Sequence, residues 1–139
     1  MKILVINGPN LNKLGTRDAE QYGSMTLPEI ESLVKREFPK DKIEFFQSNH
    51  EGKIVDEIQK SPDYFDAIII NPGGYAHTSV AIRDALELLK LPKIEVHLSN
   101  LSKREDFRNI AITAQACDGV ISGFKEEGYL AAIYLIKRI

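Results

Sequence analysis

The sequence has almost no cysteine, no long apolar run and no excess of charge of either sign. Cys117 is the single cysteine among 139 residues, which excludes an intramolecular disulfide and suits a reducing compartment. No run approaches the roughly 18 apolar residues that cross a membrane, and the apolar opening is too short for a signal peptide. The formal net charge of -2 argues against nucleic acid or an anionic membrane as the main partner. We therefore expect a cytoplasmic protein.

Several motifs of common nucleotide-binding and catalytic folds are also missing. The turn after the first apolar run, Asn7–Asn10, reads NGPN and is neither a P-loop nor a dinucleotide-binding fingerprint. Asn7 and Asn71 stand where a phosphoacceptor receiver domain needs acidic residues. There is no G-x-S-x-G nucleophile motif, and the three histidines lack the spacing of zinc ligands. These absences argue against a metal-dependent or serine-nucleophile mechanism.

Short apolar runs alternate along the chain with segments of helical periodicity. With 43% hydrophobic residues, the length fits a single globular domain over residues 1–139. The apolar runs predict strands at 2–6, 42–47, 67–70, 94–98 and 119–121. The 3.6-residue period predicts helices at 27–38, 53–60, 79–90 and 129–139, with a capping box at Thr26. The alternation predicts an α/β, three-layer, doubly wound fold of the flavodoxin-like type, with about five parallel strands.

Two connections are longer than usual for such a fold, and both follow the carboxyl end of a strand. They are residues 7–25, which we interpret as a lid or binding loop, and the polar segment after Leu98. Open α/β sheets bind ligands at this edge. Polar side chains collect there after three strands: Asn10, Arg17 and Tyr22; Asn71, His77, Thr78 and Ser79; and His97, Ser99, Asn100, Arg104 and Arg108.

Most of these side chains, taken singly, also have a structural explanation that the sequence leaves open. Tyr22 could pack the loop onto the core, and Arg17 could be a solvated surface charge. His77 could cap a turn, and His97 could be a core histidine. Arg108 could form an ion pair with Glu105 or Asp106. Glu95 alternates onto the same strand face as His97 and is expected to orient its ring. Convergence on one edge is the stronger argument for a functional site.

The motifs, taken in order, resemble one family over nearly the whole chain. They are NGPNLNKLGTR at 7–17 followed by Tyr22-Gly23, QSNHEG at 47–52, NPGGYAHTSVAIRDAL at 71–86, EVHLSNLSKREDFR at 95–108 and GFKEEGY at 123–129. This combination resembles the type II 3-dehydroquinate dehydratases, also called type II dehydroquinases. The sequence departs from the family pattern at Ala19, Ala76 and Lys125, where proline, threonine and glycine are usual.

The resemblance implies an activity and an assembly. The activity is the reversible trans elimination of water from 3-dehydroquinate to 3-dehydroshikimate through an enolate, in aromatic biosynthesis (the shikimate pathway) or quinate breakdown. It implies no metal, no redox cofactor and no lysine Schiff base. The assembly is a homo-oligomer, a dodecamer built as a tetramer of trimers, with no nucleic-acid or membrane partner.

The resemblance also implies the roles of the reacting groups. Tyr22 matches the base that removes a proton next to the ketone, and His97 matches the acid that protonates the leaving hydroxyl, with Glu95 behind it. A free tyrosine ionises only near pH 10, so a base working near neutral pH needs a close cation. Arg17 matches that cation, and Asn10 matches the residue that holds a water on the enolate oxygen.

The remaining matched residues bind substrate. Asn71 and the backbone N–H groups of Leu98 and Ser99 match a cradle for the carboxylate. His77 and Arg108 match contacts to the ring hydroxyls. Asp84 matches a residue that reaches the site of a neighbouring subunit.

Two other functions remain open on the residues alone. A flavodoxin-like module that binds a flavin or nucleotide has the same predicted fold, and fold does not determine function. An interaction protein without catalysis would leave the polar cluster as packing.

Overall fold

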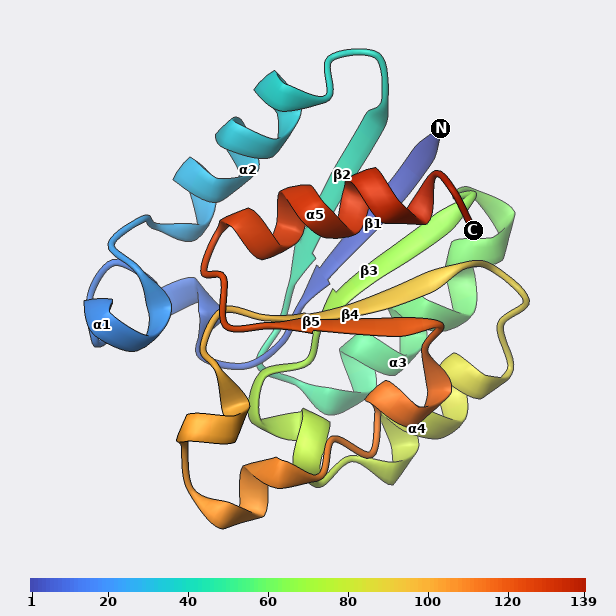
Figure 1. The fold of residues 1–139 in the computed structure, drawn as a ribbon. Coiled ribbons are helices and arrows are strands. Elements are labelled where there is room, and N and C mark those ends of the chain that lie inside the picture. The colour runs from blue at the N-terminus through green and yellow to red at the C-terminus, as the bar shows by residue number, and fades with distance from the viewer.

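A computed structural model of all 139 residues shows a five-stranded parallel sheet with helices on both sides (Figure 1). The strands are β1 (Lys2–Asn7), β2 (Lys42–Gln47), β3 (Ala67–Asn71), β4 (Lys93–His97) and β5 (Gly119–Ser122). Their order across the sheet, β2-β1-β3-β4-β5, is that of flavodoxin-like folds. All five predicted strands are therefore confirmed, with ends that differ by one residue at most.

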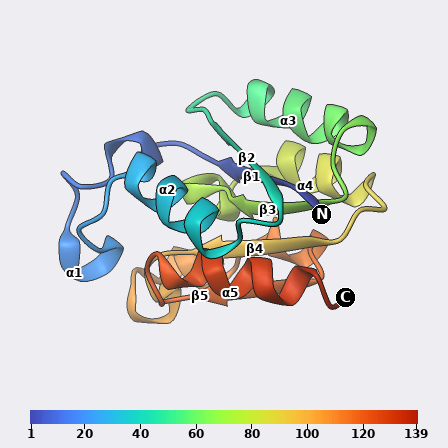
Figure 2. The same ribbon diagram turned by 90° about the horizontal axis from the view of Figure 1, so that it is seen from above.

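Four helices cover the sheet and a fifth, very short helix lies beside it. They are α1 (Ala19–Tyr22), α2 (Leu27–Glu37), α3 (Glu51–Lys60), α4 (Val80–Glu87) and α5 (Glu127–Ile136). Figure 2 shows α2 and α5 on one face of the sheet and α3 and α4 on the other. This arrangement confirms the three-layer, doubly wound prediction. None of the helices has both the length and the apolar character needed to cross a membrane.

The central strands β1 and β3 read as almost wholly apolar because the sheet buries their side chains on both faces. In β1, Ile3 and Val5 belong to a 16-residue core cluster that includes residues of α2 and α5. The alternate residues Leu4 and Ile6 belong to a 10-residue cluster with residues of α3 and α4. All five residues of β3 are buried, as expected of a central parallel strand.

The helix ends show where local sequence signals decide and where they do not. The predicted cap at Thr26 is confirmed, because its hydroxyl accepts a 3.3 Å bond from the backbone N–H of Glu29. The prediction that the segment 79–90 stays helical to residue 90 is wrong: α4 ends at Glu87, ahead of a turn that leads to Pro92. Helices α3 and α5 each begin two residues earlier than predicted, because their first turns are polar and carry no apolar periodicity.

The long connection after β1 contains structure that the sequence pattern does not predict. A 3-10 turn at Leu11–Lys13 buries Leu11, and Leu14 follows it into the core. The Asp18 side chain then accepts a 3.0 Å bond from the backbone N–H of Glu20, which starts α1. Four residues are too few to show a helical period, which is why α1 is missed. The turn and α1 together form the lid, residues 10–23.

Candidate active site

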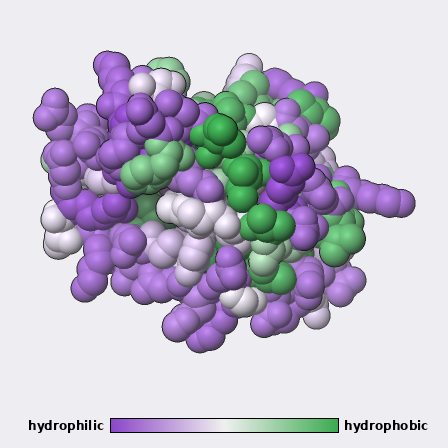
Figure 3. All heavy atoms as spheres, turned by 90° about the horizontal axis from the view of Figure 1, so that it is seen from below, coloured by the Kyte–Doolittle hydropathy of each residue, from purple (hydrophilic) through white to green (hydrophobic).

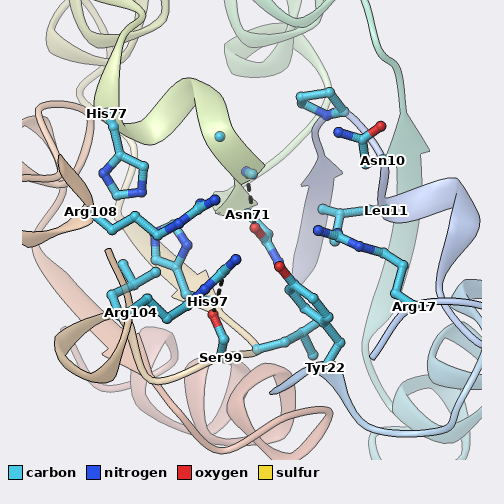
Figure 4. A pocket seen from close by; sticks show the side chains of 15 residues that line it. Asn10, Leu11, Arg17, Tyr22, Asn71, His77, His97, Ser99, Arg104 and Arg108 are labelled. Carbon is cyan, nitrogen blue, oxygen red and sulfur yellow. Dashed lines mark hydrogen bonds between the residues drawn. The ribbon is translucent and has the colours of Figure 1, made fainter. Parts of the chain in front are cut away.

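The carboxyl ends of β1, β3 and β4 border a cleft of about 100 Å³ (Figure 4). Four of its fifteen lining residues are hydrophobic, and no carboxylate lines it. Nine residues to which the resemblance assigns roles line this cleft together: Asn10, Arg17, Tyr22, Asn71, His77, His97, Leu98, Ser99 and Arg108. Its charged lining is three arginines, which favours an anionic ligand.

The floor of the cleft is fixed by a buried tyrosine that bridges two strand ends. Asn7 of β1 lies in register with Asn71 of β3. The Tyr129 hydroxyl, from α5, donates to Asn7 Oδ1 and accepts a 3.2 Å bond from Asn71 Nδ2. Asn71 Oδ1 accepts from the backbone N–H of Gly73 at 3.1 Å. Burial raises the pKa of Tyr129 despite the bond from Asn71, so the hydroxyl stays protonated. The amide of Asn71 is thereby held in one orientation, with one Nδ2 hydrogen left for a ligand.

Two guanidinium groups flank the Tyr22 ring on the lid. The Arg17 guanidinium carbon lies 3.8 Å from the ring centroid and that of Arg104 lies 5.2 Å from it. Both distances are within the range of cation–π contacts. The ring also packs against the core while the hydroxyl points into the cleft in Figure 4. Tyr22 therefore both packs the loop onto the core and lines the cleft. Arg17 contacts the Tyr22 ring and is not a free surface charge.

Two histidines lie together on the opposite side of the cleft, with their rings stacked at a centroid distance of 6.3 Å. His97 is 4% exposed, and its Nε2 lies 2.6 Å from Oε1 of the fully buried Glu95, so the expected contact between them is present. His77 Nδ1 lies 2.8 Å from the carbonyl oxygen of Ile110. A carbonyl only accepts, so Nδ1 carries a proton, and in the neutral ring Nε2 is then the acceptor. Nε2 is buried without a protein partner.

The segment after β4 supplies the other two arginines of the cleft. Arg108 pairs with Glu105, with Nε 2.8 Å from Oε2, and this bond lowers the pKa of Glu105. The ion pair left open by the sequence is thus present, while Arg108 still lines the cleft. Arg104 Nη1 donates to Ser99 Oγ at 3.1 Å (Figure 4). The sequence places Arg104 at this edge without a role. Its only signal for the contact with Ser99 is that the two residues are five positions apart in the same loop.

Asp84 lies apart from the cleft. It is exposed on α4 and does not line this chain's own cleft. No group of three or more His, Cys, Asp or Glu side chains has the arrangement to hold a metal ion.

The sequence matches the family model of class II dehydroquinases over residues 1–137. The chain belongs to the class II dehydroquinase family. A 3-dehydroquinate dehydratase of Thermotoga maritima is 49% identical over 140 residues, covering 99% of this chain and 96% of that protein. A 3-dehydroquinate dehydratase of Clostridium botulinum is 52% identical over 136 residues, which cover 96% of this chain and 92% of that protein. The crystal structure of the type II dehydroquinase of Butyrivibrio crossotus matches with a TM-score of 0.96 at 45% identity, covering 99% and 97%.

Membership of the class II dehydroquinase family makes the chain an enzyme, a hydro-lyase. It decides against the two alternatives that share the fold, a flavin-binding or nucleotide-binding module and a non-catalytic interaction protein. The cleft at the carboxyl edge of the sheet, with its tyrosine, histidine and arginine lining, is the candidate active site of this class II dehydroquinase.

Proposed function

We propose that the chain, acting as one domain over residues 1–139, converts 3-dehydroquinate reversibly to 3-dehydroshikimate by trans elimination of water. The observation that carries the proposal is the pairing of two opposed groups across one cleft. Tyr22 lies against a cation on the lid, and His97 lies against a buried carboxylate on the sheet. A base on one side and an acid on the other is the arrangement that a two-step elimination needs.

Tyr22 is the base in this proposal. Its phenolate removes the proton next to the ketone, and the electron pair moves onto the carbonyl oxygen to give an enolate. The Arg17 guanidinium, 3.8 Å from the ring centroid, stabilises the negatively charged side chain electrostatically. Asn10, at the start of the lid, holds a water that donates a hydrogen bond to the enolate oxygen.

His97 is the acid that completes the elimination. Because Nε2 is engaged by Glu95, the other ring nitrogen, Nδ1, is the one that serves the cleft. In the imidazolium form, Nδ1–H protonates the leaving hydroxyl as the enolate collapses to the conjugated enone. The Glu95 carboxylate stabilises the positive ring, in the manner of a histidine-orienting carboxylate in other acid–base sites.

The rest of the cleft recognises the substrate. The Asn71 amide and the backbone N–H groups of Leu98 and Ser99 bind the carboxylate. The acceptor Nε2 of His77 and the guanidinium of Arg108 bind the ring hydroxyls. The arginine-rich lining supports an anionic substrate.

The direct test is the ultraviolet absorbance of the conjugated enone after 3-dehydroquinate is added to the purified chain. Tyr22→Phe keeps the ring and its packing but removes the hydroxyl, so we expect kcat to fall by about 10²–10⁴. Binding of a planar enolate mimic should survive within about tenfold. A Tyr22→Phe variant with normal kcat would leave Tyr22 as a loop plug only.

The same assay tests the proposed lack of a metal or a covalent imine. Activity should survive EDTA, and it should survive borohydride in the presence of substrate. A mass increase corresponding to one reduced substrate unit after borohydride treatment would instead reveal an imine.

We further propose that the enzyme works as a dodecamer, a tetramer of trimers, in which Asp84 reaches a neighbour's cleft. Asp84 lies on the outer face of α4 between Val80 and Leu88, which are 59% and 76% exposed. These three residues share one helix face at a spacing of four. Figure 3 shows apolar side chains gathered on the underside of the molecule. Light scattering should show the assembly dissociating during dilution, and the enone assay should show activity falling with it. A fully active monomer would contradict the proposal.

The pathway and the compartment stay predictions. Use in aromatic biosynthesis or in quinate breakdown, a cytoplasmic location, and the absence of nucleic-acid and membrane partners follow from the resemblance and the composition.

A further inference from the structure

The acid side of the cleft contains a third buried polar residue that the proposed mechanism does not use. Thr113 is fully buried, and its hydroxyl donates a 2.6 Å hydrogen bond to Glu95 Oε2. The other oxygen of the same carboxylate, Oε1, is 2.6 Å from His97 Nε2. Three buried side chains therefore form a relay from Thr113 through Glu95 to His97, and only His97 reaches the cleft.

We propose that Thr113 is a positioning residue for the dehydration step, one that keeps Glu95 anionic and aimed at His97. The inference rests on the proposed function, because it assigns Thr113 a part in the acid step of that reaction.

The charge on Glu95 depends on its hydrogen bonds. The carboxylate is 0% exposed, and the only ion pair that it forms is with His97. A buried carboxylate without donors takes up a proton rather than remain charged. Because Thr113 is the one protein donor on Oε2, loss of its hydroxyl favours transfer of the shared proton from His97 to Glu95. The ring would then be neutral, and its Nδ1–H would be a far weaker acid toward the leaving hydroxyl than the imidazolium is.

The position of Thr113 in the chain adds a second argument. The segment begins at Arg108, which lines the cleft, and ends at Thr113, which donates to Glu95. Between them, the carbonyl of Ile110 accepts from His77 Nδ1 and so fixes the tautomer of the other cleft histidine. One short segment thus sets the proton positions of both stacked rings. The backbone of Thr113 is anchored independently of its hydroxyl, through its N–H to the carbonyl of Ala76.

The decisive variants separate the hydroxyl from the shape of the side chain. Thr113→Val keeps the β-branched volume and loses the donor, whereas Thr113→Ser keeps the donor and loses a methyl group. We expect Thr113→Val to lower kcat about 10- to 100-fold, the worth of one hydrogen bond to a charged group, and to change KM less than about threefold. Thr113→Ser should stay within about threefold of the wild type. Thr26→Val, which removes a threonine hydroxyl that caps α2 away from the cleft, is the matched control and should leave kcat unchanged.

A step-specific readout distinguishes positioning from mere stability. Tyr22 is proposed to remove the proton next to the ketone, so exchange of that proton with deuterated water reports the base step alone. Thr113→Val should retain exchange close to the wild-type rate while enone formation slows. In a Glu95→Gln background the same substitution should have little further effect on kcat, because the carboxylate through which Thr113 acts is gone.

Several outcomes would overturn the proposal: wild-type kcat in Thr113→Val, equal losses in the Val and Ser variants, or equal losses of exchange and dehydration. If Thr113→Val does not fold, Thr113→Ala compared with Thr113→Ser makes the same comparison. Absence of enone formation by the wild-type chain would instead refute the proposed function itself.

Discussion

Arg17 offers the sharpest test of how the lid creates a base. Its guanidinium carbon lies 3.8 Å from the Tyr22 ring centroid, and no acidic side chain lines the cleft to neutralise it. Two unit charges about 4 Å apart interact by about 4 kcal/mol at an effective dielectric constant of about 20. Arg17 is only partly buried, so solvent screening leaves about 2–4 kcal/mol. That energy corresponds to a fall in kcat of about 30- to 1000-fold for Arg17→Ala.

The assay is enone formation at saturating 3-dehydroquinate, read together with thermal unfolding. Arg17→Lys should recover only part of the loss, because an ammonium keeps the charge but cannot stack its plane on the ring. Arg36→Ala is the control, since Arg36 is 70% exposed on α2 and forms only a 3.8 Å ion pair with Glu37. An Arg17→Ala variant within about threefold of wild-type kcat would refute the electrostatic argument and return Arg17 to a packing role.

Three further predictions concern stability, measured as the free energy of unfolding in urea. Lys125 has a left-handed backbone (φ 53°), so Lys125→Gly should stabilise by up to about 1 kcal/mol, and a lower urea midpoint would contradict this. The pKa of Asp41 is lowered because ion pairs with Lys137 and the N-terminal amine outweigh burial. Asp41→Asn should therefore lower the free energy of unfolding by about 1–2 kcal/mol at pH 7. The difference between variant and wild type should shrink below about pH 4, because the wild-type carboxylate then takes up a proton. A pH-independent difference would contradict the ion-pair explanation. Tyr129→Phe removes a fully buried hydroxyl with two partners and should cost about 1–3 kcal/mol; an unchanged unfolding curve would show that these bonds contribute nothing.

The sheet was predictable because its signal is local and redundant. The signal is clearest in β1 and β3, where burial on both faces leaves almost no polar residue to obscure a short apolar run. Parallel topology then brings the carboxyl ends of three strands to one edge. For that reason, residues as distant in sequence as Tyr22, Asn71 and His97 could be grouped before their positions were known.

The parts that escaped prediction depend on contacts that no local pattern encodes. Tyr129 reads as an apolar helix residue, yet its hydroxyl joins Asn7, 122 residues away. Thr113 lies in a segment without any motif and reaches Glu95 across 18 residues. Helix α1 has four residues, fewer than the period that would reveal it. In each case the missing information is a tertiary partner, which the spacing of apolar residues does not specify.

The acid side of the cleft is buried and the base side is largely exposed, and this difference bears on the substitutions of cleft residues proposed above. The acid side rests on the sheet, where Glu95 and Thr113 are 0% exposed and His97 is 4% exposed. Changes there leave buried polar atoms without partners, so activity and stability should fall together. The base side lies on the lid, whose residues are mostly exposed and which is anchored to the core chiefly by Leu11 and Leu14. Changes to lid side chains remove few core contacts, so kcat should fall there while the free energy of unfolding stays nearly constant.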